Sequence, residues 1–221
     1  MMNYKFDICD TFFHLEFDEP VNILSSAVLN GGFCLASHFF NTKVDANFNG
    51  ERTQFEKPAL TLSKLAQTNN WEGKAVGMMT AAMMTSFRRV KLEAQGIWIE
   101  VLLTSGVSNA RRAGDKADYQ FMNETCEKVG TINMILLTNA KLSHGSLVEC
   151  IMMATEAKSA CLQDLGVKSP VSDEIATGTG TDSCAVVGGD GPIVEYCGKH
   201  VLFGELLAKT VYQALKESLE E

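Results

Sequence analysis

The sequence predicts an α+β (mixed α/β) fold, in which a largely antiparallel or mixed sheet carries helices packed on at least one face. Three observations lead to it: short apolar segments typical of strands fill most of the first half, two longer segments in the second half have helical periodicity, and strands do not alternate strictly with helices. The 221 residues contain no repeat, low-complexity tract or flexible linker. We therefore expect a single domain spanning residues 1–221.

The first half of the chain is predicted to begin with two short strands, residues 12–17 and 21–25, separated by an Asp-Glu-Pro turn at 18–20. The Asn-Gly-Gly sequence at 30–32 predicts a second turn. A helix is predicted for residues 58–69, because a proline opens this segment and apolar residues then recur at helical spacing.

The clearest strand patterns lie in the middle of the chain. A strand is predicted for residues 76–80, and an antiparallel hairpin for residues 87–92 and 96–104. The segment 131–138 is apolar on both faces, which is typical of a central strand covered on both sides. A further strand is predicted for residues 183–187.

Two amphipathic helices are predicted near the C-terminus. The first runs from about residue 146 to 165, since Ser146 and Glu149 have the spacing of a capping box and Gly166 suits the position after a helix end. The second spans residues 203–218, where large apolar residues recur every fourth position.

Composition excludes several classes of function. The 19 Lys and Arg residues against 27 Asp and Glu give a net charge of −8, and such a chain without a basic stripe is a poor nucleic-acid binder. We find no signal peptide and no apolar segment long enough to cross a membrane, so a cytoplasmic protein without a membrane partner is expected. The seven cysteines are scattered and lack metal-ligand spacing, so no metal site is expected.

Four polar, glycine-punctuated stretches flank the apolar strands, where loops held by a rigid scaffold often carry function. Residues 25–32 could bring backbone close to a ligand, or form only a hairpin turn. Residues 104–115 could supply hydroxyl, amide and guanidinium donors to a ligand. The alternative is that they form only a solvated connection with a local Arg–Asp pair. Residues 177–182 could form an oxyanion or phosphate nest, with Asp182 as a general base.

The fourth stretch opens the predicted central strand. Asn133 lies in an otherwise apolar segment and needs a hydrogen-bond partner, which is either structural or substrate. Thr131 follows a glycine at the strand entrance and is a candidate nucleophile; the alternative is a β-branched residue that only supports the strand. On the helix from residue 146, helical geometry places Lys158 on the apolar stripe and Glu156 on the solvated side.

These stretches, in this order, resemble the CbiZ family of adenosylcobinamide amidohydrolases. The residues at both ends and at about 47–56 carry little of the resemblance, and the region around His144 gives that histidine no role. The matching segments are 25–32 (SSAVLNGG), 76–82 (VGMMTAA), 104–115 (TSGVSNARRAGD), 130–139 (GTINMILLTN), 154–158 (ATEAK) and 176–182 (ATGTGTD).

The resemblance implies an enzyme that hydrolyses the amide joining aminopropanol to the corrin ring of adenosylcobinamide, giving adenosylcobyric acid and 1-aminopropan-2-ol. The corrinoid would be the substrate, so no cofactor is expected, and a homo-oligomer is left open. Our hypothesis for the chemistry makes Asp182 the base and the backbone of 178–181 the oxyanion donor, with Glu156 or Lys158 assisting proton transfer.

Neutral polar groups suit the amide side chains of a corrin. The residues expected to bind substrate are Ser25, Ser26, Asn30, Gly31, Gly32, Thr80, Ser108, Asn109, Arg111, Asp115, Asn133, Thr177, Gly178, Thr179, Gly180 and Thr181.

Three other functions remain open. Thr131 could be a covalent nucleophile acting on another amide, which predicts a trappable acyl-enzyme and chain cleavage before Thr131. The protein could bind corrinoids without turnover, or bind phosphate through the threonine-glycine loop.

Overall fold

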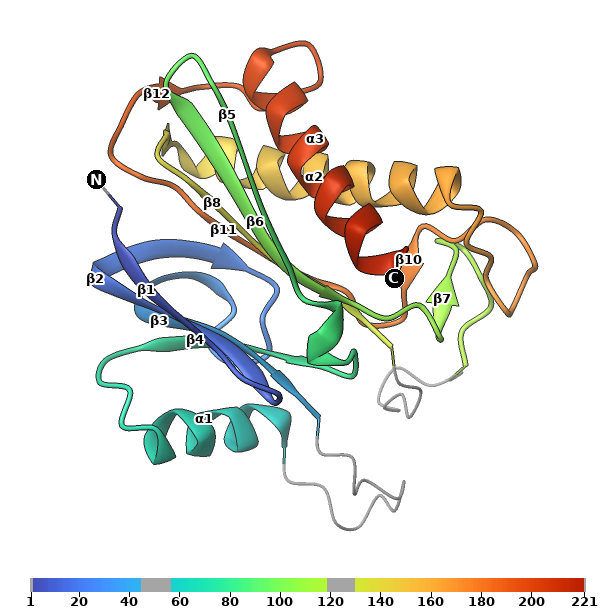
Figure 1. Ribbon diagram of the computed structural model, residues 1–221, viewed down its shortest axis with the longest axis horizontal. Helices are drawn as coiled ribbons and strands as arrows, with labels where there is room; N and C mark the ends of the chain where they lie inside the picture. Colours follow the sequence, from blue (N-terminus) through green and yellow to red (C-terminus); the bar gives the residue numbers. More distant parts are fainter. Residues whose placement is uncertain (1, 45–56, 119–129, 221) are drawn as a thin grey trace.

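The computed structural model describes residues 2–44, 57–118 and 130–220, and it confirms a mixed α/β fold (Figure 1). An eight-stranded sheet has the order β4-β3-β2-β11-β8-β6-β5, with β1 paired to β2. The sheet strands are β1 (Tyr4–Ile8), β2 (Phe12–Ser25), β3 (Gly32–Lys43), β4 (Ala75–Thr80), β5 (Arg88–Ala94), β6 (Ile97–Ser105), β8 (Ile132–Thr138) and β11 (Ser183–Val187). The remaining elements are helices α1 (Pro58–Thr68), α2 (His144–Asp164) and α3 (Leu202–Leu219), the short turn η2 (Met84–Ser86), and the two-residue strands β7 (Ala110–Arg111), β9 (Lys141–Leu142), β10 (Gly178–Thr179) and β12 (Ile193–Val194).

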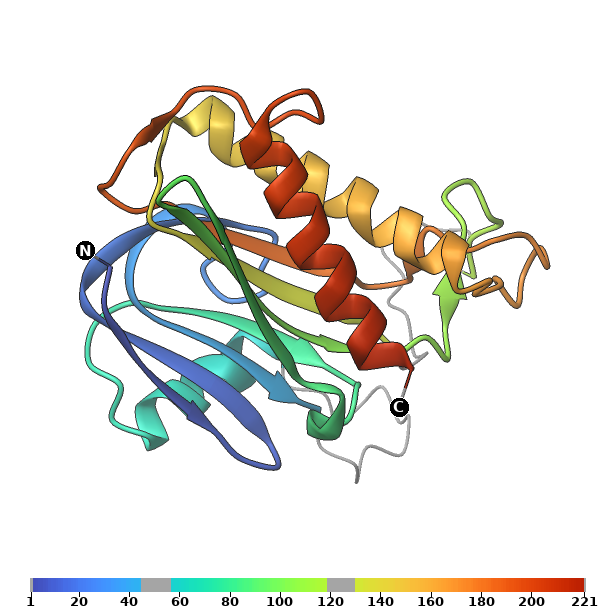
Figure 2. The ribbon, with the colours of Figure 1, turned by 45° about the horizontal axis from the view of Figure 1, so that its top comes forward.

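The elements form four layers, because the sheet folds so that its two halves face each other. Helices α2 and α3 cover the outer face of β5, β6, β8 and β11, with a buried apolar cluster between them (Figure 2). A second cluster joins the inner faces of β2, β3 and β4 to those of β6, β8 and β11. A third, smaller cluster lies between α1 and the outer face of β3 and β4. Helices therefore cover both outer faces, which meets the expectation of at least one.

The turn predicted at residues 18–20 is wrong, because β2 runs through it as one strand. Its pairing with β3 is interrupted between Glu16 and Val21, and the three exposed turn-like residues lie in this irregular stretch. Pro20 has no N–H to donate to a ladder, so it is tolerated where the pairing is broken. A bulge replaces the predicted turn.

The predicted hairpin and central strand are confirmed. Strands β5 and β6 pair antiparallel, and both residues of their turn, Gln95 and Gly96, have positive φ angles of 50° and 76°. All seven residues of β8 are buried, with β11 parallel on one side and β6 antiparallel on the other. The start of β8 is thus held from both edges.

Helix α2 begins two residues before its predicted start. Its N-cap is Ser143, whose side chain accepts a hydrogen bond from the Ser146 N–H at 3.1 Å. Glu149 accepts instead from the Cys197 N–H at 2.7 Å, so the predicted capping box is wrong. Gly166 has the positive φ of 64° that favours glycine after a helix end, as predicted.

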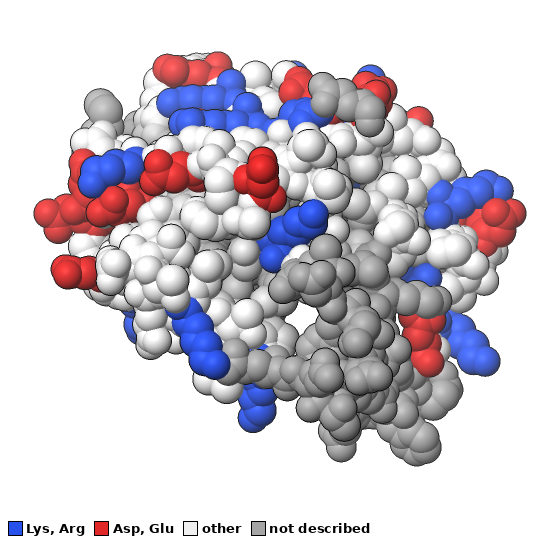
Figure 3. Space-filling model, turned by 60° about the horizontal axis from the view of Figure 1, so that its bottom comes forward, with Lys and Arg blue, Asp and Glu red and all other residues white. Residues whose placement is uncertain are grey.

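No helix in the described part of the chain has both the length and the apolar character needed to cross a membrane. Among the described residues on the face shown in Figure 3, acidic and basic side chains are interspersed, and uncharged surface separates them.

Candidate active site

The candidate site lies where the parallel strands β8 and β11 begin. Their register places Ser183 opposite Asn133, so the segments leading into both strands lie side by side. The loop before β11 also contributes β10, which pairs with β7. Three of the four predicted polar stretches therefore converge, and Ser26 of the remaining stretch, 25–32, reaches Ser183 at the same place. The three are residues 104–115, 130–133 and 177–182.

Thr131 stands at the entrance to β8 and is only 2 % exposed. Its hydroxyl lies within donating distance of two acceptors, the side-chain oxygen of Asn133 at 3.0 Å and the main-chain oxygen of Thr181 at 2.8 Å. Gly106 donates its N–H to the Thr131 carbonyl at 3.0 Å. Contacts from two segments therefore orient the Thr131 side chain, and a third segment holds its main chain.

A buried polar network supports Thr131 from the inner face of the sheet. The Asn133 amide donates to the side chain of Asn41 at 2.8 Å and to the Met79 carbonyl at 2.9 Å. Asn41 in turn donates to the Thr104 hydroxyl at 2.9 Å. The hydrogen-bond partners of Asn133 all belong to the protein, and its side-chain oxygen lies within reach of the Thr131 hydroxyl.

Asn109 is the exception in this otherwise satisfied region. It is 4 % exposed, and neither polar atom of its amide has a hydrogen-bond partner among the described residues. The amide lies between two glycines: a Cβ added to Gly130 would come within 2.1 Å of its Oδ1, and one added to Gly180 within 3.4 Å of its Nδ2. An unpartnered buried amide costs free energy, which makes the Asn109 side chain a candidate ligand-binding group.

Asp182 has no acceptor site left for another donor. Its Oδ1 accepts from the Ile132 N–H at 3.0 Å and from the Thr179 hydroxyl, while its Oδ2 accepts from the Thr179 N–H at 3.0 Å and from the Lys158 ammonium. A carboxylate offers about four lone-pair sites, and four donors fill them. Lys158 is buried, as helical geometry predicted.

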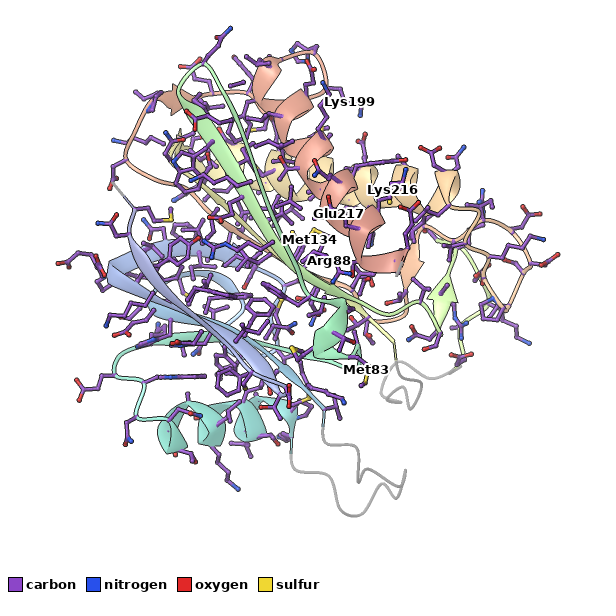
Figure 4. All side chains as sticks on the ribbon, viewed as in Figure 1. Met83, Arg88, Met134, Lys199, Lys216 and Glu217 are labelled. Atoms are coloured by element: carbon purple, nitrogen blue, oxygen red, sulfur yellow. The ribbon has the colours of Figure 1, made fainter. Side chains whose placement is uncertain are left out.

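A pocket of about 160 Å³ adjoins this ion pair on the side of the sheet that faces α2. Ser26, Lys158, Asp182 and Ser183 form its polar wall, and the Ser26 and Ser183 hydroxyls lie 3.0 Å apart. Met134, labelled in Figure 4, is one of its apolar residues and belongs to the cluster beneath α2 and α3.

Cys184 also lines this pocket but is not equipped as a nucleophile. Burial raises the pKa of its thiol to about 12, so the thiol stays protonated at neutral pH. Two larger hollows of about 300 Å³ lie elsewhere, and neither is lined by a residue that the sequence predicted for the site.

Glu156 lies away from the convergence, on the exposed side of α2, where it pairs with Lys199. Lys199, labelled in Figure 4, precedes the start of α3. Arg111 pairs with Asp118 at 2.6 Å. Hydrogen bonding by the Ser169 hydroxyl is the main cause that holds the pKa of Asp115 below its usual value.

Other predicted binding residues are used in turns and local caps. Asn30 has a φ of 54° and donates to the Ala75 carbonyl at 2.8 Å, while a Cβ on Gly31 would meet the Ala27 carbonyl oxygen at 2.2 Å. Ser25 accepts weakly from the Ala27 N–H at 3.4 Å. The predicted binding residues not described above are Gly32, Thr80, Ser108, Thr177 and Gly178, of which Ser108 is exposed and Thr80 is fully buried.

Sequence reasoning missed Asn41 and Ser183. Asn41 is a fully buried amide in the long strand β3, directly after Phe39 and Phe40, and an Asn beside large apolar residues is the same kind of signal that drew attention to Asn133. Ser183 carried no signal, because its contact with Ser26 joins residues 157 positions apart.

A threonine hydroxyl oriented beside an unpartnered amide is the equipment of a hydrolase that acts at a carbonyl carbon. The family model for adenosylcobinamide amidohydrolase matches residues 3–221. The chain belongs to this amidohydrolase family.

The chain is also similar to individual proteins, one of which carries the name of the family. An adenosylcobinamide amidohydrolase of Methanosarcina mazei is 27 % identical over 198 residues, which cover 88 % of each chain. An uncharacterized protein of Methanocaldococcus jannaschii is 37 % identical over 156 residues, covering 64 % of this chain and 61 % of its own length. Among solved structures, a Burkholderia beta-aminopeptidase aligns with a TM-score of 0.45 and 13 % identity, covering 96 % of this chain and 78 % of its own.

Proposed function

We propose that the protein hydrolyses the amide between aminopropanol and the corrin ring of adenosylcobinamide, releasing adenosylcobyric acid and 1-aminopropan-2-ol. Membership of the family supports the substrate. The observation that carries the chemistry is the pairing of an oriented Thr131 hydroxyl with the unpartnered amide of Asn109 across Gly130.

In the proposed reaction, Thr131 Oγ1 attacks the carbonyl carbon of the substrate amide. The Asn109 amide donates to the oxygen as it becomes negative, a role for which a preorganised neutral donor is well suited. Collapse expels 1-aminopropan-2-ol with a proton on its nitrogen and leaves an ester on Thr131. Water then hydrolyses the ester, which restores the hydroxyl and releases the corrin carboxylate. None of these steps uses a bound cofactor.

We propose Thr131 as nucleophile rather than a water activated by Asp182. A general base needs a lone pair directed at the proton it removes, and four donors already occupy the oxygens of Asp182. Asp182 and Lys158 are therefore positioning residues, since they tie the 177–182 loop and α2 to the first amide of β8. This removes Glu156 and Lys158 from the proton transfer expected from sequence.

The pocket beside the Lys158–Asp182 pair has the size for one side arm of the substrate. Its 160 Å³ is well below the roughly 300 Å³ at which sites for drug-sized ligands begin, so a corrin macrocycle does not fit. We propose that Ser26 and Ser183 bind a neutral amide or hydroxyl of such an arm while the ring stays outside.

The test is incubation with adenosylcobinamide followed by mass spectrometry for adenosylcobyric acid and 1-aminopropan-2-ol. We expect product from the wild-type chain and none from Thr131→Val, which keeps the side-chain shape and removes the hydroxyl. Thr138→Val is the matched control, because Thr138 is a buried threonine at the other end of β8. Binding of the corrinoid without release of aminopropanol would favour a non-catalytic binding protein, and equal turnover by Thr131→Val would exclude the proposed nucleophile.

A further inference from the structure

We propose that the protein cleaves its own peptide bond between Gly130 and Thr131, so that Thr131 becomes an N-terminal residue with a free α-amine. This inference rests on the proposed function, because it uses the same hydroxyl. It adds a second reaction, in which the chain itself is the substrate.

Among the described residues, no base lies within reach of the Thr131 hydroxyl. The two described groups that this hydroxyl reaches are the amide oxygen of Asn133 and the carbonyl oxygen of Thr181, and neither takes up a proton near neutral pH. The nearby carboxylate of Asp182 is fully occupied by its four donors. A free α-amine has a pKa of about 7.7–8.0, and pairing with its own N-terminal amine is an established way to activate threonine.

The peptide bond between Gly130 and Thr131 is also polarised by a hydrogen bond to its carbonyl oxygen. The carbonyl oxygen of Gly130 accepts from the Thr181 hydroxyl at 3.1 Å. Donors at a carbonyl oxygen stabilise the negative charge that develops when a nucleophile adds to its carbon. The hydroxyl that would attack belongs to the next residue.

The backbone conformation of Gly130 also points to this bond. Its φ of 150° favours glycine, and a Cβ there would collide with Asn109 Oδ1 at 2.1 Å. The buried amide without a partner therefore lies directly against the bond to be cut. A half-turn of that amide would place its Nδ2 on this side as a further donor.

The step balances without another reactant than water. Thr131 Oγ1 bonds to the carbonyl carbon of Gly130, the carbon–nitrogen bond breaks, and the hydroxyl proton passes to the departing nitrogen. This gives an ester between Gly130 and the Thr131 side chain. Water then splits the ester into a carboxylate on Gly130 and a restored hydroxyl on Thr131, beside the new amine.

Cleavage would also solve a problem of access, since Thr131 is 2 % exposed in the intact chain. Once the bond is cut, Gly130 is free to move away from the hydroxyl. The two fragments would stay together, because β8 pairs with β6 over seven residues and β11 pairs with β2. Cleavage would therefore be visible only after denaturation.

The experiment is intact-mass and N-terminal analysis of the purified full chain under denaturing conditions, over time and at several protein concentrations. We expect fragments 1–130 and 131–221, with a new N-terminus of Thr-Ile-Asn and a rate independent of concentration. Thr131→Val should remain a single chain, Thr131→Ser should be cut, and the matched control Thr138→Val should be cut like the wild type. Thermal unfolding of Thr131→Val checks that it is folded.

The outcomes separate this inference from the proposed function. A wild-type chain that stays intact while releasing adenosylcobyric acid would overturn self-cleavage and leave the proposed hydrolysis standing. Cleavage of Thr131→Val would also overturn it, since a contaminating protease would then be responsible. A chain cut before Thr131 that makes no adenosylcobyric acid would support self-cleavage and refute the substrate.

Discussion

Replacing Asp182 with asparagine would leave the ammonium of Lys158 buried beside a neutral amide. The two side chains are only 10 % and 17 % exposed, so water compensates neither charge well. Asparagine would also turn one acceptor oxygen into an NH₂ group, in a place where four donors converge. Removing one partner of a buried pair typically costs about 3–5 kcal/mol.

That cost should be visible in thermal unfolding. For a chain of 150–250 residues, about 1 kcal/mol shifts Tm by roughly 2–4 °C, so Asp182→Asn should lower Tm by roughly 6–20 °C. The matched control is Glu156→Gln. Glu156 lies on α2, the helix that carries Lys158, and this substitution breaks its ion pair with Lys199, whose two side chains are 50 % and 69 % exposed for Glu156 and Lys199. Exposed pairs contribute about 0–1 kcal/mol, so its Tm should fall by no more than about 4 °C.

A second variant separates the buried charge from other effects. Lys158→Met in the Asp182→Asn background removes the uncompensated ammonium and should recover part of the lost Tm. The reasoning would be refuted if Asp182→Asn and Glu156→Gln shifted Tm equally, or if the added Lys158→Met lowered Tm further.

Three further predictions concern other residues. Burial, with a smaller contribution from His38, lowers the pKa of His14 to about 4 from 6.5. As the pH falls, the unfolded chain therefore binds this proton before the folded chain does. The contribution of neutral His14 to the free energy of unfolding is complete above about pH 6.5 and falls toward pH 4, by at most about 1.4 kcal/mol per pH unit. Urea unfolding at pH 7, 5.5 and 4.5 should show this slope in the wild type and a shallower one in His14→Gln; equal slopes would contradict it. Asn109→Ala should slow adenosylcobyric acid formation by roughly 10²–10³-fold with little change in unfolding free energy, because its amide makes no hydrogen bond to the described residues; unchanged turnover would remove it from the site. Tyr4→Phe should lower the free energy of unfolding in urea by about 1–3 kcal/mol without slowing turnover, because the Tyr4 hydroxyl donates to the buried Glu100 carboxylate at 2.5 Å. An unchanged free energy of unfolding would show that this hydrogen bond is dispensable.

Much of the fold follows from local patterns. The β5–β6 hairpin, the fully buried β8 and the inward Lys158 were all predictable, because alternation, turn glycines and helical periodicity act over a few residues. The turn at 18–20 was wrong for a tertiary reason. Strand β2 pairs with β1 and β3 on either side of that stretch, and these pairings carry it through Pro20 as one strand.

The sequence predicts which loops carry polar residues of the candidate site, but it does not predict which of these residues contact one another. Glycines, threonines and amides identified the loops, but the four donors to Asp182 come from β8, the 177–182 loop and α2. A sequence pattern does not show that these donors converge, so the sequence alone leaves Asp182 available as a base. The isolation of Asn109 is likewise a property of packing, since it depends on which groups fail to reach its amide.

The central claim is that the Thr131 hydroxyl performs the amide hydrolysis. It is tested most directly by the rate of adenosylcobyric acid formation from adenosylcobinamide, measured by mass spectrometry for the wild type, Thr131→Val and Thr138→Val. The account predicts a loss of at least about 10³-fold for Thr131→Val and near-wild-type turnover for Thr138→Val. Wild-type turnover by a folded Thr131→Val protein would contradict it.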